Sequence, residues 1–79
     1  MKIEKVFLDN ETLYVKLNSG HIIGNPIVWF ERLNSATPEQ RNDFEIGVTK
    51  QSIHWEKLNE DISLESLFDF KRELNHAKI

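Results

Sequence analysis

Hydrophobic residues alternate with other residues through the first part of the chain, as they do in strands that bury one face. Segments 3–8 and 12–17 are rich in β-branched and aromatic residues, and every second residue from Leu13 to Leu17 is aliphatic. The residues between them, 9–11, are polar. The pattern predicts two antiparallel strands joined by a short turn.

A second turn and a third strand follow. Residues 18–20 have the composition of a turn, and Gly20 is free to adopt a positive φ. We expect residues 21–24 to return as a strand. The first third of the chain is therefore predicted to be a three-stranded antiparallel β-meander.

The hydrophobic period changes after Asn25. Asparagine is a favoured helix cap, and Pro26 is tolerated at a first helical position. We expect a helix from Pro26 to about Asn34. Every third residue of this segment is apolar, and these residues form one stripe, made of Ile27, Phe30 and Leu33.

A second short helix is predicted to start after Thr37. Pro38 would take the first helical position, and Gln40 would complete a capping box with the threonine. Alternating apolar residues then predict a strand over 44–48, and residues 52–55 should pair with it through a polar turn. These two strands form a predicted second β-hairpin.

The last predicted element is a C-terminal helix capped by Ser63. Ile62 and Leu67 flank its start in the positions of a hydrophobic staple. Glu60 and Asp61 come just before the cap, where the positive end of the helix dipole stabilises carboxylates. We therefore expect this pair to serve the helix start.

Together these elements predict the α+β class: a three-stranded antiparallel β-meander, two short helices, a second β-hairpin and a C-terminal helix. A chain of 79 residues is too short for two cores, so we expect one domain over 1–79. Residues 1–5 lack the apolar run that a signal peptide would have, and no apolar stretch approaches the ~20 residues of a membrane span. We expect a cytoplasmic protein without a membrane partner.

No catalytic or metal-binding motif is visible. His21, His54 and His76 fall on different predicted elements, none beside a second ligand, and the chain has no cysteine. Glu60 and Asp61 could form an acid/base pair, but no nucleophile accompanies them. The glycines are isolated, which argues against a phosphate-binding loop. We expect a protein that is not an enzyme and has no cofactor or metal.

A longer run of residues resembles the small bacterial family catalogued as domain of unknown function 2442, from about Val6 to Leu67. The resemblance is carried by Gly20, Pro26, Phe30, Arg32, Leu33, Ala36, Thr37, Glu39, Arg41, Gly47, Ile53, Trp55, Leu58, Glu60, Asp61, Ile62 and Ser63. The chain departs from the family pattern at Glu31, where the family often has proline, and at Asn59, where it often has aspartate.

The resemblance implies a compact α+β domain with no established activity. Relatives are often encoded beside a second small protein, which suggests a toxin–antitoxin role, and some carry a fused helix-turn-helix. In this chain residues 68–79 are expected only to extend the last helix, so direct operator recognition is not supported.

Acidic residues are concentrated in the second half of the chain. Residues 31–69 hold nine acidic residues against four basic ones, and the whole chain has a formal charge of −3. Such a surface attracts a basic protein and repels nucleic acid. The alternative interpretation is a solvated acidic surface that serves solubility.

These observations lead to two functional hypotheses. The first is a non-enzymatic protein-binding module, the antitoxin-like or accessory half of a two-protein system, whose partner is a small basic protein encoded nearby. Its expected partner-binding residues are Trp29, Glu56, Glu60, Asp61, Glu65 and Asp69. Core packing is the alternative role for Trp29, as it is for Trp55.

The second hypothesis is a nucleic-acid-binding transcriptional regulator. The net charge disfavours nucleic acid, but a homodimer would gather the basic residues of the two ends of the chain, which are Lys2, Lys5, Lys16, Lys71, Arg72 and Lys78.

Overall fold

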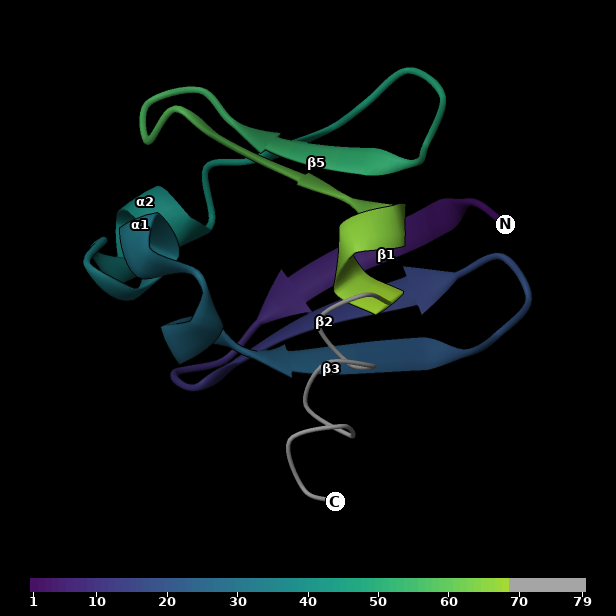
Figure 1. Ribbon diagram of the computed structural model, residues 1–79, viewed down its shortest axis with the longest axis horizontal. Coiled ribbons are helices and arrows are strands. Elements are labelled where there is room, and N and C mark those ends of the chain that lie inside the picture. The colour runs from purple at the N-terminus through teal and green to yellow at the C-terminus, as the bar shows by residue number, and fades with distance from the viewer. Residues whose placement is uncertain (69–79) are drawn as a thin grey trace.

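The N-terminal strands form one antiparallel sheet. The computed structural model describes residues 1–68, and β1 (Ile3–Leu8), β2 (Thr12–Leu17) and β3 (Ile22–Pro26) lie in the order β1-β2-β3 (Figure 1). The predicted meander is confirmed, with the first two strands at their predicted bounds. Gly20 has φ +96°, as its turn requires.

A bulge near the start of β1 sets which side chains face inward. Ile3 lies opposite Leu17, but Lys5 lies opposite Lys16, so the register shifts between them. Ile3 and Val6 are both buried although they are three residues apart. The extra residue in the bulge reconciles this spacing with the two-residue period of a strand.

The predicted helix start at Asn25 and Pro26 is wrong. Asn25 continues β3 opposite Leu13 and is 1% exposed, and the chain leaves the sheet only after Pro26. The Ile27 N–H still donates to the Glu11 carbonyl oxygen at 2.8 Å. Pairing with β2 therefore overrides the local preference of asparagine for a cap.

Two short helical segments replace the predicted helix. They are the 3-10 helix η1 (Ile27–Trp29) and α1 (Glu31–Asn34), and neither has a side-chain cap. The predicted apolar stripe is confirmed, because Ile27, Phe30 and Leu33 are all buried.

The second predicted helix is α2 (Pro38–Arg41), and its capping box is confirmed. Gln40 N–H donates to Thr37 Oγ1 at 3.1 Å, and the Thr37 N–H donates to Gln40 Oε1 at 3.0 Å. The side chain of Arg41 then donates to the carbonyl oxygens of Leu33 and Asn34, at 2.8 and 3.0 Å. Arg41 therefore satisfies carbonyl groups at the end of α1.

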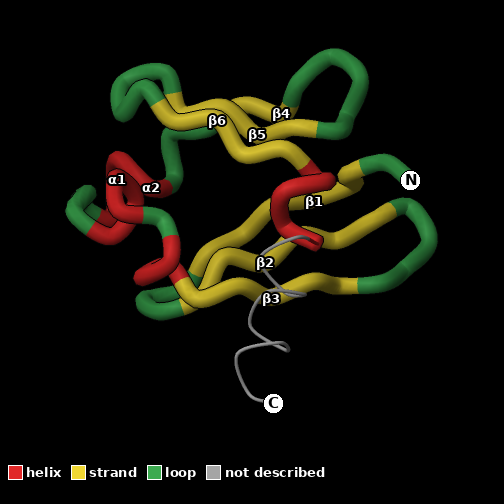
Figure 2. Tube along the Cα trace, viewed as in Figure 1, coloured by secondary structure: helices red, strands yellow, loops and turns green. Residues whose placement is uncertain are grey.

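The second sheet has three strands rather than the two of the predicted hairpin. Strands β4 (Glu45–Ile46), β5 (Ser52–Trp55) and β6 (Glu60–Ser63) lie in the order β4-β5-β6 (Figure 2). Strand β5 has its predicted bounds. The strand predicted over 44–48 is shorter, and Val48 is fully exposed in the turn that leads to β5.

The expectation that Glu60 and Asp61 serve a helix start is also corrected, because both residues belong to β6. Asp61 lies opposite His54, and Ile62 lies opposite Ile53. Ile62 is buried against the core, and this burial favours a strand here.

The predicted cap at Ser63 is confirmed. The Ser66 N–H donates to Ser63 Oγ at 3.1 Å, and residues 64–68 are helical. The predicted extension over 68–79 lies outside the described residues, apart from Phe68.

The two sheets share one core. The Ile3 N–H donates to the Lys50 carbonyl oxygen at 2.7 Å and links β1 to the β4–β5 turn. Helices α1 and α2 lie beside each other at one end of the two sheets (Figure 1). Both sheets, η1, α1 and the helical residues 64–68 contribute buried side chains, of which Trp55 is the largest. Within residues 1–68 no helix combines the length and the apolar character that crossing a membrane requires.

Candidate functional site

A hollow lies between the η1–α1 segment and β6. We call it the Trp29 hollow and define it by the residues that line it, which are Trp29, Phe30, Glu31, Glu60, Asp61, Ile62 and Ser66. It encloses about 300 Å³. It brings together chain segments that are about thirty residues apart in the sequence.

The turn at η1 fixes the position of Trp29. Ile27 and Phe30 on either side of it are buried, and they direct the segment against the core. Trp29 itself is partly buried and packs on the edge of that core. The structure therefore places Trp29 at the edge of the core, and its predicted role at an interface stays a prediction.

Strand β6 supplies the other wall of the hollow. Its buried Ile62 holds the strand against the core, whereas Asp61 is exposed and Glu60 is partly buried. The Arg32 guanidinium donates to the carbonyl oxygen of Asn59, which has φ 52° in the turn before β6. This bond ties α1 to the turn and fixes the two walls relative to each other.

The hollow is acidic. Glu31, Glu60 and Asp61 are among its lining residues, and no lysine or arginine is among the described residues that line it. The carboxyl group of Asp61 is paired with His54, so Glu31 and Glu60 are the acidic residues whose carboxyl groups have no basic partner among the described residues. A cationic group that entered would meet an aromatic ring as well as carboxylates. Glu31 was not among the sequence-predicted site residues. The sequence signal that could have pointed to it is its place at the start of the acidic stretch 31–69.

His54 and Asp61 form a pair on the open side of the second sheet. The Nδ1 atom of His54 lies 2.7 Å from Asp61 Oδ1, and the side chains are 40% and 74% exposed. The expectation that no histidine lies beside a second possible ligand is therefore wrong. The sequence analysis missed the pair because it did not place Asp61 on a strand next to β5. Among residues 1–68, no three His, Cys, Asp or Glu side chains are grouped so as to hold a metal ion.

The remaining predicted partner-binding residues lie elsewhere. Glu56 is exposed in the turn between β5 and β6. Glu65 lines a separate hollow with Met1 and Phe68. Asp69 lies outside the described residues. The structure therefore brings together Trp29, Glu60 and Asp61 of the predicted set.

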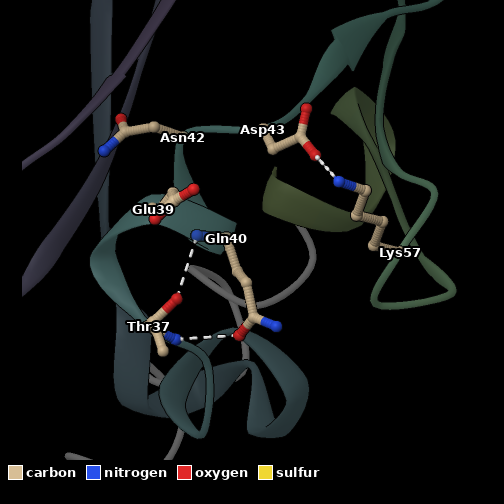
Figure 3. Close-up of a pocket in the computed structure, with 6 residues that line it drawn as sticks. All are labelled: Thr37, Glu39, Gln40, Asn42, Asp43 and Lys57. Atoms are coloured by element: carbon tan, nitrogen blue, oxygen red, sulfur yellow. Dashed lines mark hydrogen bonds and ion pairs between the residues drawn. The ribbon is translucent and has the colours of Figure 1, made fainter.

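A larger and more open pocket lies beside α2 (Figure 3). Its polar groups other than Glu39 are engaged within the chain: Thr37 and Gln40 form the capping box, and Lys57 Nζ lies 3.5 Å from Asp43 Oδ2. Asn42 Nδ2 donates to the Pro38 carbonyl oxygen at 2.9 Å. We therefore assign this pocket a structural role.

The family model described as "Protein of unknown function (DUF2442)" matches residues 3–73. The chain belongs to the DUF2442 family. The match is wider than the resemblance seen in the sequence. No curated protein and no solved structure matches the chain.

Several DUF2442 motif residues hold the fold together. Arg32 and Arg41 bond to carbonyl oxygens of neighbouring segments, and Thr37 and Ser63 cap helices. Trp55 is fully buried. These roles explain five of the motif residues by architecture. Trp29 and the acidic residues that line its hollow are taken as the functional candidates because the hollow brings them together.

Proposed function

We propose that the chain is a non-enzymatic protein-binding module that receives a basic side chain of its partner in the Trp29 hollow. The observation that carries the proposal is that Glu31 and Glu60 line one hollow with a partly buried tryptophan, beside the His54–Asp61 pair. A small basic protein encoded nearby is the proposed partner. The chain would act in the cytoplasm as the antitoxin-like or accessory half of a two-protein system.

The chemistry of the hollow suits an arginine or a lysine. A guanidinium or ammonium group gains from a nearby indole face and from charge-assisted hydrogen bonds to carboxylates. Carboxylates at the entrance also speed the approach of a basic protein. Aromatic anchors in partly covered pockets are frequent sites of strong binding in protein interfaces.

Binding explains the described side chains of this hollow better than catalysis does. Its hydroxyl group, Ser66 Oγ, donates to the Ser63 carbonyl oxygen at 2.8 Å instead of to a base. A serine nucleophile needs an adjacent general base. Within residues 1–68 the imidazole of His54 pairs with Asp61 and forms no hydrogen bond with Ser66.

The proposal is tested by removing charge from the hollow without changing side-chain shape. We expect Glu31→Gln combined with Glu60→Gln to slow association with the neighbouring gene's product about tenfold at low salt. The matched control is Glu11→Gln combined with Glu39→Gln, which removes the same charge elsewhere and should alter the rate much less. Stopped-flow rates over a salt series measure both. Equal rates for the two double variants would exclude the hollow as the binding site.

A specific observation also favours the second hypothesis, a nucleic-acid-binding regulator. Lys5 and Lys16 lie opposite each other on the outer face of the first sheet, beside the stacked rings of Phe7 and Tyr14. Lysines and aromatic rings together suit single-stranded nucleic acid. Fluorescence anisotropy with a labelled oligonucleotide tests it: we expect Lys5→Gln with Lys16→Gln to abolish salt-sensitive binding. An unchanged affinity would exclude this face.

A further inference from the structure

The edge strands of the two sheets differ in how they are protected from other strands. The main chain of β1 bonds to the other sheet through the Ile3 N–H and the Lys50 carbonyl oxygen. Strand β4 has only two residues, and β6 carries Glu60 and Asp61. Strand β3 has no charged residue between Ile22 and Pro26. Short length, charge, proline and covering are the usual protections of a sheet edge. Strand β3 has only Pro26, at its end, so it is the least protected edge among residues 1–68.

The hydrogen bonds at the two ends of the β2–β3 ladder show which residues face β2. The Leu17 N–H donates to the His21 carbonyl oxygen, and the Ile27 N–H donates to the Glu11 carbonyl oxygen, both at 2.8 Å. Hydrogen-bonded pairs alternate with non-hydrogen-bonded pairs in an antiparallel ladder. The odd-numbered residues 21–27 therefore direct their main-chain polar groups toward β2.

The even-numbered residues of β3 direct their main-chain N–H and carbonyl groups away from β2. Ile22 and Gly24 each present an N–H and a carbonyl group at the open edge, and Pro26 presents only a carbonyl group. In Figure 1, β3 is the strand of the first sheet farthest from the second sheet. Within residues 1–68 no main-chain group bonds to Ile22 or Gly24 on this side, so the described part of the chain leaves a short template for another strand, centred on Ile23.

Ile22 and Gly24 are residues of this edge whose side-chain positions lie on the outer face of the sheet. Ile22 is 56% exposed on the outer face of the sheet, in the same row as Lys16. Gly24 lies on that face opposite Tyr14, and a Cβ atom there would lie 3.3 Å from Tyr14 Cε1. An exposed aliphatic side chain and a position without a side chain are thus two residues apart on one strand.

We propose that two copies of this chain associate through antiparallel pairing of β3 with β3, with Ile22 opposite the partner's Gly24 and a two-fold axis at Ile23. In this register Ile22 and Gly24 of each copy donate to and accept from the other, and Pro26 is not required to donate. The Tyr14 ring of each copy already lies over its own Gly24, and Ile22 of the other copy packs against the edge of that ring. The two sheets join into one continuous six-stranded sheet.

A second copy fits this edge because the pairing is isologous, so each copy supplies what the other needs. The paired segment carries no charge, which avoids like-charge repulsion at the contact between two chains of net charge −3. The segment is short, because the turn at Gly20 ends it on one side and Pro26 on the other. Small interfaces associate weakly, so we expect dimerisation between about 10 μM and about 1 mM.

The first test is sedimentation velocity of the whole chain across that concentration range. We expect the average mass to rise from monomer toward dimer, and we expect Ile22→Lys to raise the dissociation constant at least about tenfold. The matched control is Val48→Lys, which adds the same charge at a fully exposed position in the turn between β4 and β5. It should leave the dissociation constant unchanged within about twofold. Far-UV circular dichroism checks that both variants are folded.

Amide hydrogen exchange gives a second readout that a general aggregation would not reproduce. Exchange at Ile22 and Gly24 should slow more strongly with rising protein concentration than exchange at Ile23, which is already bonded to β2 in the monomer. A monomer at every concentration overturns the proposal. So does a dimer that Ile22→Lys leaves intact, or a dimer in which the exchange of Ile22 and Gly24 is unaffected.

Discussion

The indole nitrogen of Trp55 donates a hydrogen bond of 2.9 Å to the main-chain carbonyl oxygen of Arg41. Trp55 is fully buried in β5, and Arg41 is the last residue of α2. The guanidinium group of the same Arg41 bonds to the carbonyl oxygens that end α1. One residue therefore links the second sheet to both short helices, neither of which is long enough to be stable alone.

Replacing Trp55 by Phe should destabilise the fold. The substitution removes the indole donor, leaves the Arg41 carbonyl group without this partner and opens a space beside Phe44, whose ring centroid lies 5.9 Å away. We expect a loss of about 2–3 kcal/mol in the free energy of unfolding, measured by urea denaturation. A loss below about 0.5 kcal/mol would show that the link between β5 and α2 contributes little.

Replacing Ser63 by Ala should remove the helix cap. Ser63 Oγ accepts from the Ser66 N–H, and no other described side chain takes that role. We expect unfolding to become easier by about 0.5–2 kcal/mol. Ser35→Ala is the matched control, because Ser35 is exposed and makes no side-chain hydrogen bond with the described residues. Equal effects of the two substitutions would contradict a capping role.

Replacing Asn25 by Val should stabilise the protein. Asn25 is 1% exposed, and its Nδ2 has no hydrogen-bond partner among the described residues. A buried unpaired donor costs about 1–3 kcal/mol, and valine suits a strand on its buried face. We expect a gain of about 1 kcal/mol in thermal or urea unfolding. A loss of stability would instead indicate a buried water molecule bound to the amide.

The turn between β1 and β2 should make stability depend on pH. The main-chain N–H groups of Glu11 and Thr12 donate to Asp9, and the Tyr14 hydroxyl adds a weaker bond; together they hold the pKa of the Asp9 carboxyl below its usual range. A carboxyl whose pKa is lower in the folded state stabilises the fold above its unfolded pKa. That contribution is lost as the pH falls through the lower, folded pKa.

Comparison with Asp9→Asn isolates this effect. Asparagine can accept the same main-chain bonds but does not titrate, so the acid limb of the variant should be shallower. Urea denaturation between about pH 6 and about pH 2 measures both limbs, and an NMR titration reads the Asp9 carboxyl directly. Parallel limbs in the two proteins would show that Asp9 does not contribute.

Local signals in the sequence were sufficient to predict the elements whose structure depends on residues close together in the chain. The first two strands, β5, the capping box at Thr37 and the cap at Ser63 were predicted at their observed places. Alternation and capping depend on side chains within a few residues of each other. Each of these predictions therefore required no knowledge of distant contacts.

The errors fall where a distant segment competes with a local preference. Asn25 has the sequence context of a helix cap, but its main chain pairs with Leu13 in β2. Glu60 and Asp61 precede a helix, but they pair with β5 instead. At both places the strand is stabilised by pairing with a neighbouring strand, and a local sequence pattern contains no information about that neighbour.

The sequence by itself determined the family, the α+β class, the acidic second half and most of the individual elements. Only the tertiary structure decided that Trp29 and Glu31 line one hollow with Glu60 and Asp61, that His54 and Asp61 form a pair, and that no strand within residues 1–68 pairs with the outer edge of β3. The reason is physical: these features depend on sheet register and on the docking of α1 against the β5–β6 turn. Both arise from burial of a shared core, which acts between residues far apart in the chain.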